Sequence, residues 1–162
     1  MEVRPDKEIP MTADGSRPLH ILVITNETAR GEELYEAVLS YAAAADATDV
    51  LVVAPALNSR LKHWLSDEDG ARREATQRVE HCVGRLQRAG LTAEGHIGDP
   101  DPLHAIEDAL GQYPADRIVI STHPEGRSNW LAHDLVGRAE QQFHLPVTHV
   151  VVDLERAGAR QA

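Results

Sequence analysis

The sequence predicts an α/β fold: a three-layer α/β/α sandwich built on an open, doubly wound sheet of five parallel strands, in the Rossmann-like manner. Short apolar runs alternate along the chain with segments of helical period, which is the pattern of repeated βαβ units. The 162 residues are 42% hydrophobic, enough for one domain with a substantial core. Because only 4% are aromatic, the core is expected to be aliphatic.

Five runs are expected to form strands because each is short, and most are rich in Val, Ile and Leu. They are residues 19–24, 50–53, 92–97, 117–120 and 147–152. A helix is expected after each of the first four strands: at 32–45, at 66–89, from Pro102 onward, and at 129–143. Asp101 and Pro102 are typical of an N-cap and first helical position, and Gly90 of a helix stop.

The two ends of the chain lack any periodic pattern. Residues 1–18 and 154–162 are expected to be a flexible arm and tail around a folded domain at 19–153. No run is long and apolar enough to span a bilayer and no signal peptide opens the chain, so we expect a cytoplasmic protein without membrane contact.

Charge and cysteine content exclude several classes of function. The chain has 26 acidic and 16 basic residues, a net charge of −10, which argues against nucleic-acid binding. The single cysteine, Cys82, rules out an internal disulfide and is expected to be a buried thiol on a helix. The nine histidines have no metal-ligand spacing, so no metal site is expected, and the scarcity of aromatic residues argues against a flavin.

Ligands of doubly wound sheets bind at the carboxyl ends of the strands. The most informative segment there follows the fourth strand, where hydroxyl groups, Gly126 and Arg127 precede an expected helix. Free backbone N–H groups at a helix N-terminus favour an anion, so this segment suits a phosphate. The alternative is that Gly126 only turns the chain and that Ser128 or Asn129 caps the helix.

The loop after the second strand is long and basic. Arg60 and Lys62, together with Arg127, would make a positive pocket that suits a phosphate in an otherwise acidic protein. Trp64 would either stack on a base or anchor the loop.

At these segments the chain resembles the universal stress protein family over residues 19–153. The resemblance rests on Gly98-Asp99-Pro100, on residues 115–123 followed by Gly126-Arg127-Ser128, and on Leu145-Pro146-Val147 before the last strand. It implies the strand order 3-2-1-4-5, an adenine-nucleotide-binding fold, a homodimer through the last strand, and a role in stress responses without dedicated catalysis. Residues 54–60 and 121–131 look like a single-domain subgroup common in actinobacteria.

The resemblance also implies where a nucleotide would lie, across the ends of the first and fourth strands. It places Asn26, Ala54 and Leu57 toward the base, Gly126, Arg127 and Ser128 on the phosphate, and Thr122 and His123 nearby.

The glycine motif of ATP-binding members is degenerate here. Those members carry Gly, two residues, Gly, nine residues, then Gly before Ser or Thr. In this chain His123 stands three positions before Gly126 and Val136 ten after it, and Asn26 replaces the usual Asp. ATP or AMP, another phosphorylated metabolite, and no nucleotide at all therefore remain as alternatives.

Two other classes of function stay open. One is a small enzyme acting on a phosphorylated metabolite, with His123 as acid–base and Arg60 and Arg127 as anion clamps. The other is an interaction module without a bound nucleotide. A hydrolytic triad of Ser121, His123 and Asp134 has the right residue types, but nothing in their spacing brings them together.

Overall fold

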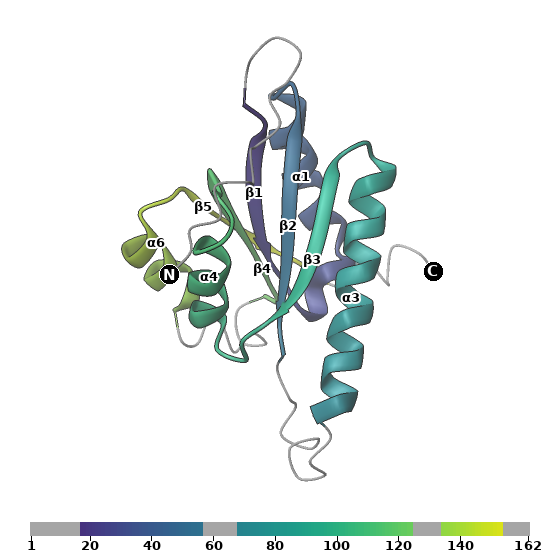
Figure 1. The fold of residues 1–162 in the computed structure, drawn as a ribbon, viewed down its shortest axis with the longest axis vertical. Helices are drawn as coiled ribbons and strands as arrows, with labels where there is room; N and C mark the ends of the chain where they lie inside the picture. The colour runs from purple at the N-terminus through teal and green to yellow at the C-terminus, as the bar shows by residue number, and fades with distance from the viewer. Residues whose placement is uncertain (1–16, 57–67, 125–133, 154–162) are drawn as a thin grey trace.

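The computed structural model describes residues 17–56, 68–124 and 134–153 (Figure 1). Five strands form one sheet in the order β3-β2-β1-β4-β5, and every neighbouring pair is parallel, as predicted. The strands are β1 (Leu19–Ile24), β2 (Thr48–Pro55), β3 (Thr92–Gly98), β4 (Arg117–Thr122) and β5 (Val147–Val151).

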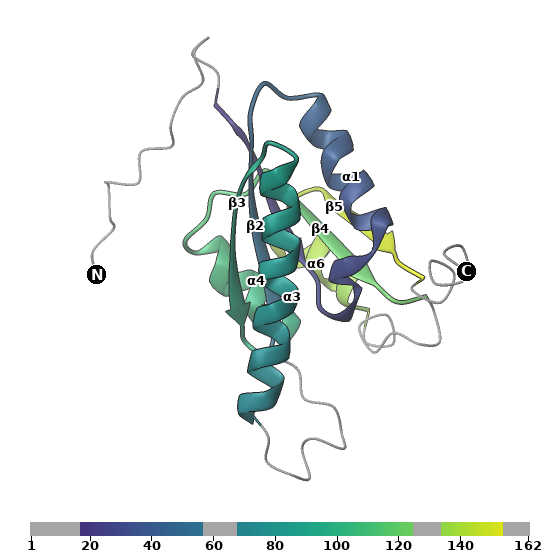
Figure 2. The same ribbon diagram turned by 90° about the vertical axis from the view of Figure 1, so that its right-hand side faces the viewer.

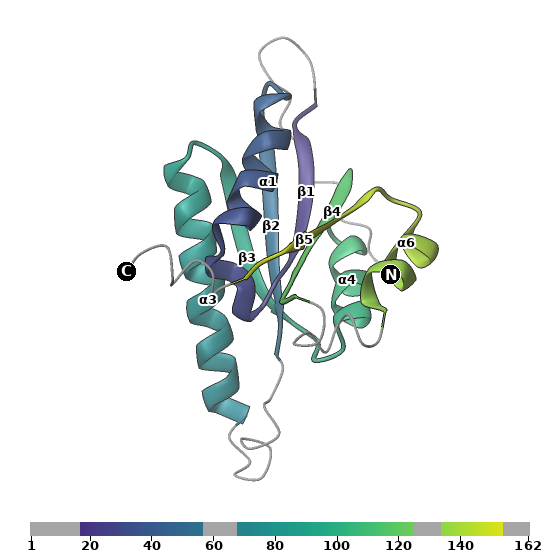
Figure 3. The same ribbon diagram turned by 180° about the vertical axis from the view of Figure 1, so that it is seen from behind.

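Helices cover both faces of the sheet, which confirms the three-layer prediction. The helices α1 (Glu32–Ala43) and α3 (Glu68–Arg88) pack on one face, and α4 (Pro102–Leu110) and α6 (Leu135–Phe143) on the other (Figures 1 and 3). Seen from the side, α3 runs alongside β2 and β3 (Figure 2). A short 3-10 helix, η1 (Glu27–Arg30), links β1 to α1 and was not expected from the sequence.

Successive side chains of the central strands enter opposite cores, as the period of two along a strand requires. In β1, Ile21 and Val23 join the core under α1 and α3, whereas Leu22 and Ile24 join the core under α4 and α6. All four side chains are 0% exposed. This double burial explains why β1 reads as a continuous apolar run.

Two of the predicted helix ends are confirmed. The Asp101 carboxylate accepts a hydrogen bond from the Leu103 N–H at 3.0 Å, with Pro102 in the first helical position of α4. Gly90 has φ +94°, the left-handed conformation expected where α3 stops.

The predicted helix over 129–143 is wrong as one continuous element. Asp134 has φ 50°, which is left-handed, so α6 begins only at Leu135. The Asp134 carboxylate caps this start by accepting from the Gly137 N–H at 3.3 Å. Residues 125–133 lie outside the described part of the chain.

Gly95 in β3 lets α3 approach the sheet closely. A Cβ at Gly95 would lie 2.1 Å from Val79 Cγ1 of α3, far below any real contact. This close packing fixes α3 above β2 and β3, and therefore fixes where its side chains meet the ends of those strands.

The structure places the last two residues of the predicted arm. Arg17 forms an ion pair with Asp116 at 3.2 Å, and the Pro18 carbonyl accepts a hydrogen bond from the His20 ring at 2.9 Å. Residues 1–16 and the predicted tail at 154–162 lie outside the described part of the chain.

Candidate functional site

The carboxyl ends of β1, β2 and β4 lie at one edge of the sheet because the three strands are neighbours and parallel. This edge brings together four of the residues predicted for the site: Asn26, Ala54, Thr122 and His123. The other four predicted residues, Leu57, Gly126, Arg127 and Ser128, lie outside the described residues, as do Arg60, Lys62 and Trp64.

A closed ring of three hydroxyl groups joins β1, η1 and β4 at this edge. Ser121 Oγ donates to Thr25 Oγ1 at 2.6 Å, Thr25 Oγ1 lies 3.3 Å from Thr28 Oγ1, and Thr28 Oγ1 lies 2.7 Å from Ser121 Oγ. Each hydroxyl has one proton, so donation around the ring satisfies all three. Their residues are 0%, 2% and 0% exposed for Thr25, Thr28 and Ser121.

This ring determines what Ser121 can do. The Ser121 hydroxyl donates its proton in the hydrogen bond to Thr25, and its side chain has no access to solvent. Asp134, the third residue considered for a triad, caps α6. Ser121 therefore acts as a structural link between the two central strands rather than as a nucleophile.

Asn26 connects three elements through its side-chain amide. Its Nδ2 donates to the Pro55 carbonyl at the end of β2 at 2.9 Å. Its Oδ1 accepts from Arg78 Nη1 of α3 at 2.6 Å. Asn26 is 8% exposed, so both ends of its amide are engaged inside the protein.

Arg78 is the cation that is bonded to this amide. Its side chain is 25% exposed, and its Nη2 lies 3.8 Å from Glu74 Oε2, one helical turn earlier. Sequence reasoning missed Arg78 because it lies 52 residues from Asn26 and reads as one of several charges on a long helix.

The side chains of Ala54 and Thr122 are almost fully buried, which limits their direct contact with a ligand. The Ala54 side chain is 0% exposed in the core under α1 and α3, so only its backbone can face a ligand. Thr122 is 2% exposed, and its hydroxyl donates to the His123 carbonyl at 2.9 Å. That hydroxyl also lies 2.8 Å from His149 Nε2 of β5. Because the Thr122 hydroxyl already donates its one proton to the His123 carbonyl, His149 Nε2 must donate to Thr122 Oγ1.

Cys82 is buried, as predicted. It lies at 0% exposure in the core between α1, α3 and the sheet. Burial raises the pKa of its thiol to about 11, so the thiol stays protonated at neutral pH. Within the described ranges, no group of three or more His, Cys, Asp or Glu could hold a metal ion, and no helix is long and apolar enough to cross a membrane.

The order of the strands along the sheet changes direction between β1 and β4, and polar residues follow the carboxyl end of each of these two strands. These features define the doubly wound α/β class, whose ligands bind at such a reversal.

Within this class, the chain has the fold of the universal stress proteins. It aligns with the universal stress protein of Archaeoglobus fulgidus at a TM-score of 0.59 and 20% identity, covering 82% of this chain and 93% of that one. It aligns with a universal stress protein family protein of Arabidopsis thaliana with AMP bound at a TM-score of 0.61 and 11% identity, covering 86% and 95%. The sequence matches no protein-family model and no curated protein.

Proposed function

We propose that this chain is a cytoplasmic regulatory protein of the universal stress protein type, which binds an adenine nucleotide, AMP or ATP, without dedicated catalysis. The observation that carries the proposal is the strand reversal between β1 and β4, where the predicted residues Asn26, Thr122 and His123 lie. The AMP-bound Arabidopsis structure, similar over 86% of this chain, supports the choice of ligand.

The nucleotide would lie across the ends of β1 and β4. The base would face Asn26 and the backbone of the segment from Ala54 to Leu57. Gly126, Arg127 and Ser128 would hold the phosphate, with Thr122 and His123 beside them. Arg127 matters most in this arrangement because the chain carries a net charge of −10 and would otherwise repel an anion.

Calorimetric titration of the nucleotide-stripped protein with AMP and ATP tests this proposal. We expect saturable binding in the micromolar range that Arg127→Ala weakens about tenfold, because a charge-assisted hydrogen bond to phosphate is lost. Arg88→Ala is the matched control, since Arg88 is exposed in the last turn of α3. No heat with either nucleotide would contradict the proposal.

We also propose a homodimer through β5. This strand ends the sheet next to β4, and its Val151 is 45% exposed. An apolar residue on an edge strand favours pairing with a second copy. Val151→Asp is expected to convert the dimer to a monomer in sedimentation velocity, whereas Thr92→Asp on the opposite edge strand should not. A wild-type chain that sediments as a monomer would refute the dimer.

A further inference from the structure

Arg78 is held at the end of β1 by its contact with Asn26. Its Nη1 donates to Asn26 Oδ1 at 2.6 Å, and Asn26 in turn is fixed by the Pro55 carbonyl at 2.9 Å. The guanidinium therefore has a defined place between the ends of β1 and β2. Its side chain is 25% exposed, so part of the guanidinium is accessible to solvent.

The charge of Arg78 is only weakly compensated by its acidic neighbour. Glu74 lies 3.8 Å away and its side chain is 47% exposed. An ion pair of this length between solvated groups contributes little and is screened by salt. Asn26 is neutral, so its amide directs the guanidinium without cancelling its charge. Among the residues that the structure describes, the Arg78 guanidinium therefore keeps most of its positive charge at the end of β1.

In dinucleotide-binding members of the doubly wound class, a side chain near the ribose distinguishes a free ribose hydroxyl from a phosphorylated one. An acidic residue there accepts hydrogen bonds from the free ribose hydroxyls, whereas a nearby arginine accommodates a phosphate on the sugar. Arginine suits this role because its planar group binds phosphate through two parallel N–H groups. Here an amide stands at the end of β1 with an arginine directly on it.

We propose that Arg78 makes this site select adenine nucleotides that carry a phosphate on the 2′ or 3′ hydroxyl of the ribose. The proposal rests on the proposed function, because it needs the nucleoside to lie at the ends of β1 and β2. In this arrangement, Arg78 binds the phosphate on the ribose.

The test compares AMP with adenosine 2′,5′-bisphosphate and adenosine 3′,5′-bisphosphate by calorimetry. We expect at least one bisphosphate to bind the wild-type protein about tenfold more tightly than AMP, the gain of one charge-assisted contact. The isomer with the larger gain identifies the hydroxyl that faces Arg78. In Arg78→Ala, the affinity for the preferred bisphosphate divided by the affinity for AMP should fall to about one. Arg88→Ala on the same helix should leave the ratio unchanged.

The ratio separates ligand binding from a structural role of Arg78. Removing the guanidinium also leaves Asn26 Oδ1 without its partner, which could lower affinity for all nucleotides alike, but such damage leaves the ratio unchanged. Arg78→Lys provides a second variant that keeps the charge without the planar fork, and it should retain part of the preference.

The possible failures are distinct. If AMP binds and neither bisphosphate binds more tightly, the inference is wrong while the proposed function stands. A preference that persists unchanged in Arg78→Ala also overturns the inference, because another group then binds the ribose phosphate. If no adenine nucleotide binds at all, both proposals are wrong.

Discussion

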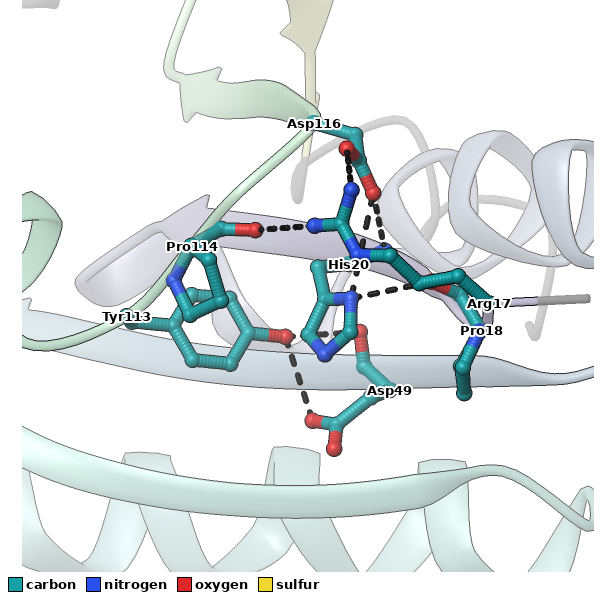
Figure 4. Close-up of polar contacts among 7 residues, drawn as sticks. All are labelled: Arg17, Pro18, His20, Asp49, Tyr113, Pro114 and Asp116. Atoms are coloured by element: carbon teal, nitrogen blue, oxygen red, sulfur yellow. Dashed lines mark hydrogen bonds and ion pairs between the residues drawn. The ribbon is translucent and has the colours of Figure 1, made fainter. Parts of the chain in front are cut away.

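The two ends of the sheet both carry polar clusters, but they are built in different ways. At the amino end, residues from three segments of the chain bond to one another and to backbone carbonyl groups (Figure 4). At the carboxyl end, the hydroxyl ring is closed, whereas the Arg78 guanidinium beside it is bonded to the neutral Asn26 and has the Glu74 carboxylate only at 3.8 Å. The comparison separates a cluster that stabilises the fold from one that we propose also binds a ligand.

The amino-end cluster pairs its cation, Arg17, with a carboxylate and a backbone carbonyl. Asp116 accepts from the His20 backbone N–H at 2.9 Å and pairs with Arg17 at 3.2 Å. Tyr113 donates to the Asp49 carbonyl at 2.8 Å, and its ring packs against the His20 ring in a T-shaped arrangement with centroids 5.3 Å apart. Arg17 also donates to the Pro114 carbonyl at 3.0 Å. These contacts join the starts of β1 and β2 to the loop between α4 and β4, so the cluster is expected to act on stability alone.

Tyr113→Ala should have the largest effect of the changes considered. Tyr113 is 8% exposed in the core under α4, so truncation removes its ring packing and its hydrogen bond together. We expect the free energy of unfolding to fall by about 3 to 5 kcal/mol in urea titrations. Nucleotide affinity, measured where the variant is still folded, should not change. A selective loss of affinity would break the comparison between the two ends.

Ser121→Ala should have the next largest effect, at the other end of the sheet. It opens the hydroxyl ring and leaves the buried Thr25 and Thr28 hydroxyls one partner short. The expected cost is about 1 to 3 kcal/mol in the free energy of unfolding. Ser40→Ala, on the exposed face of α1, is the control and should change it by less than about 0.5 kcal/mol. Equal effects at both serines would mean that the ring does not stabilise the fold.

The fold could be predicted because burial on both faces leaves a direct trace in the sequence. The three inner strands β1, β2 and β4 appear as apolar runs, and Asp101 and Gly90 mark helix ends through strictly local chemistry. Asp134 misled the prediction because apolar residues continue at four-residue steps on both sides of it. Only the left-handed backbone at Asp134 shows that the helix starts later.

The candidate site could be predicted only in part. The polarity of the strand ends located the edge of the sheet, including Asn26 and Thr122. The contacts that define the role of each side chain connect distant positions: Thr28 meets Ser121 across 93 residues, and Asn26 meets Arg78 across 52. Spacing along one chain carries no signal for such pairs, since they arise from the packing of η1 and α3 against the sheet.

Tyr113→Phe tests the amino end through pH. Burial first, and then the neighbouring Asp49, raises the pKa of Tyr113. The folded state therefore holds this proton beyond the unfolded pKa of about 10, so the associated stability is present below that pH and is lost as the pH rises above it. We expect a cost of about 1 kcal/mol at pH 7 and a shallower alkaline decline than in the wild type.

The alkaline decline should not vanish in Tyr113→Phe. Tyr35 on α1, between the helices rather than at the end of the sheet, also has its pKa raised by burial. Unfolding free energies measured from pH 8 to above pH 10 would check this. An alkaline decline identical to that of the wild type would show that Tyr113 ionises as easily in the folded as in the unfolded chain.

His149→Gln should have the smallest effect and should appear on the acidic side. Desolvation lowers the pKa of His149, so the unfolded chain takes up this proton more readily than the folded one. The folded state therefore loses stability as the pH falls below the ordinary histidine value of about 6.5. Glutamine removes this titration and can still donate an amide N–H to Thr122 Oγ1, so stability at pH 8 should be unchanged and the decline toward pH 5 should be shallower.

His81→Gln is the matched control for His149→Gln. The pKa of His81 on α3 is also lowered, by desolvation and then by Arg30, Arg85 and Arg88, but it lies away from the Thr122 hydroxyl. Both variants should flatten the acidic decline, whereas only a change at His149 can alter nucleotide affinity through Thr122. If nucleotide affinity changes in His149→Gln but not in His81→Gln, the contact between β5 and the end of β4 affects binding. The carboxyl end of the sheet would then differ from the amino end, because one contact there contributes both to stability and to binding. If neither shifts it, the His149–Thr122 contact is structural, and the contrast between the two ends rests on Arg78 alone.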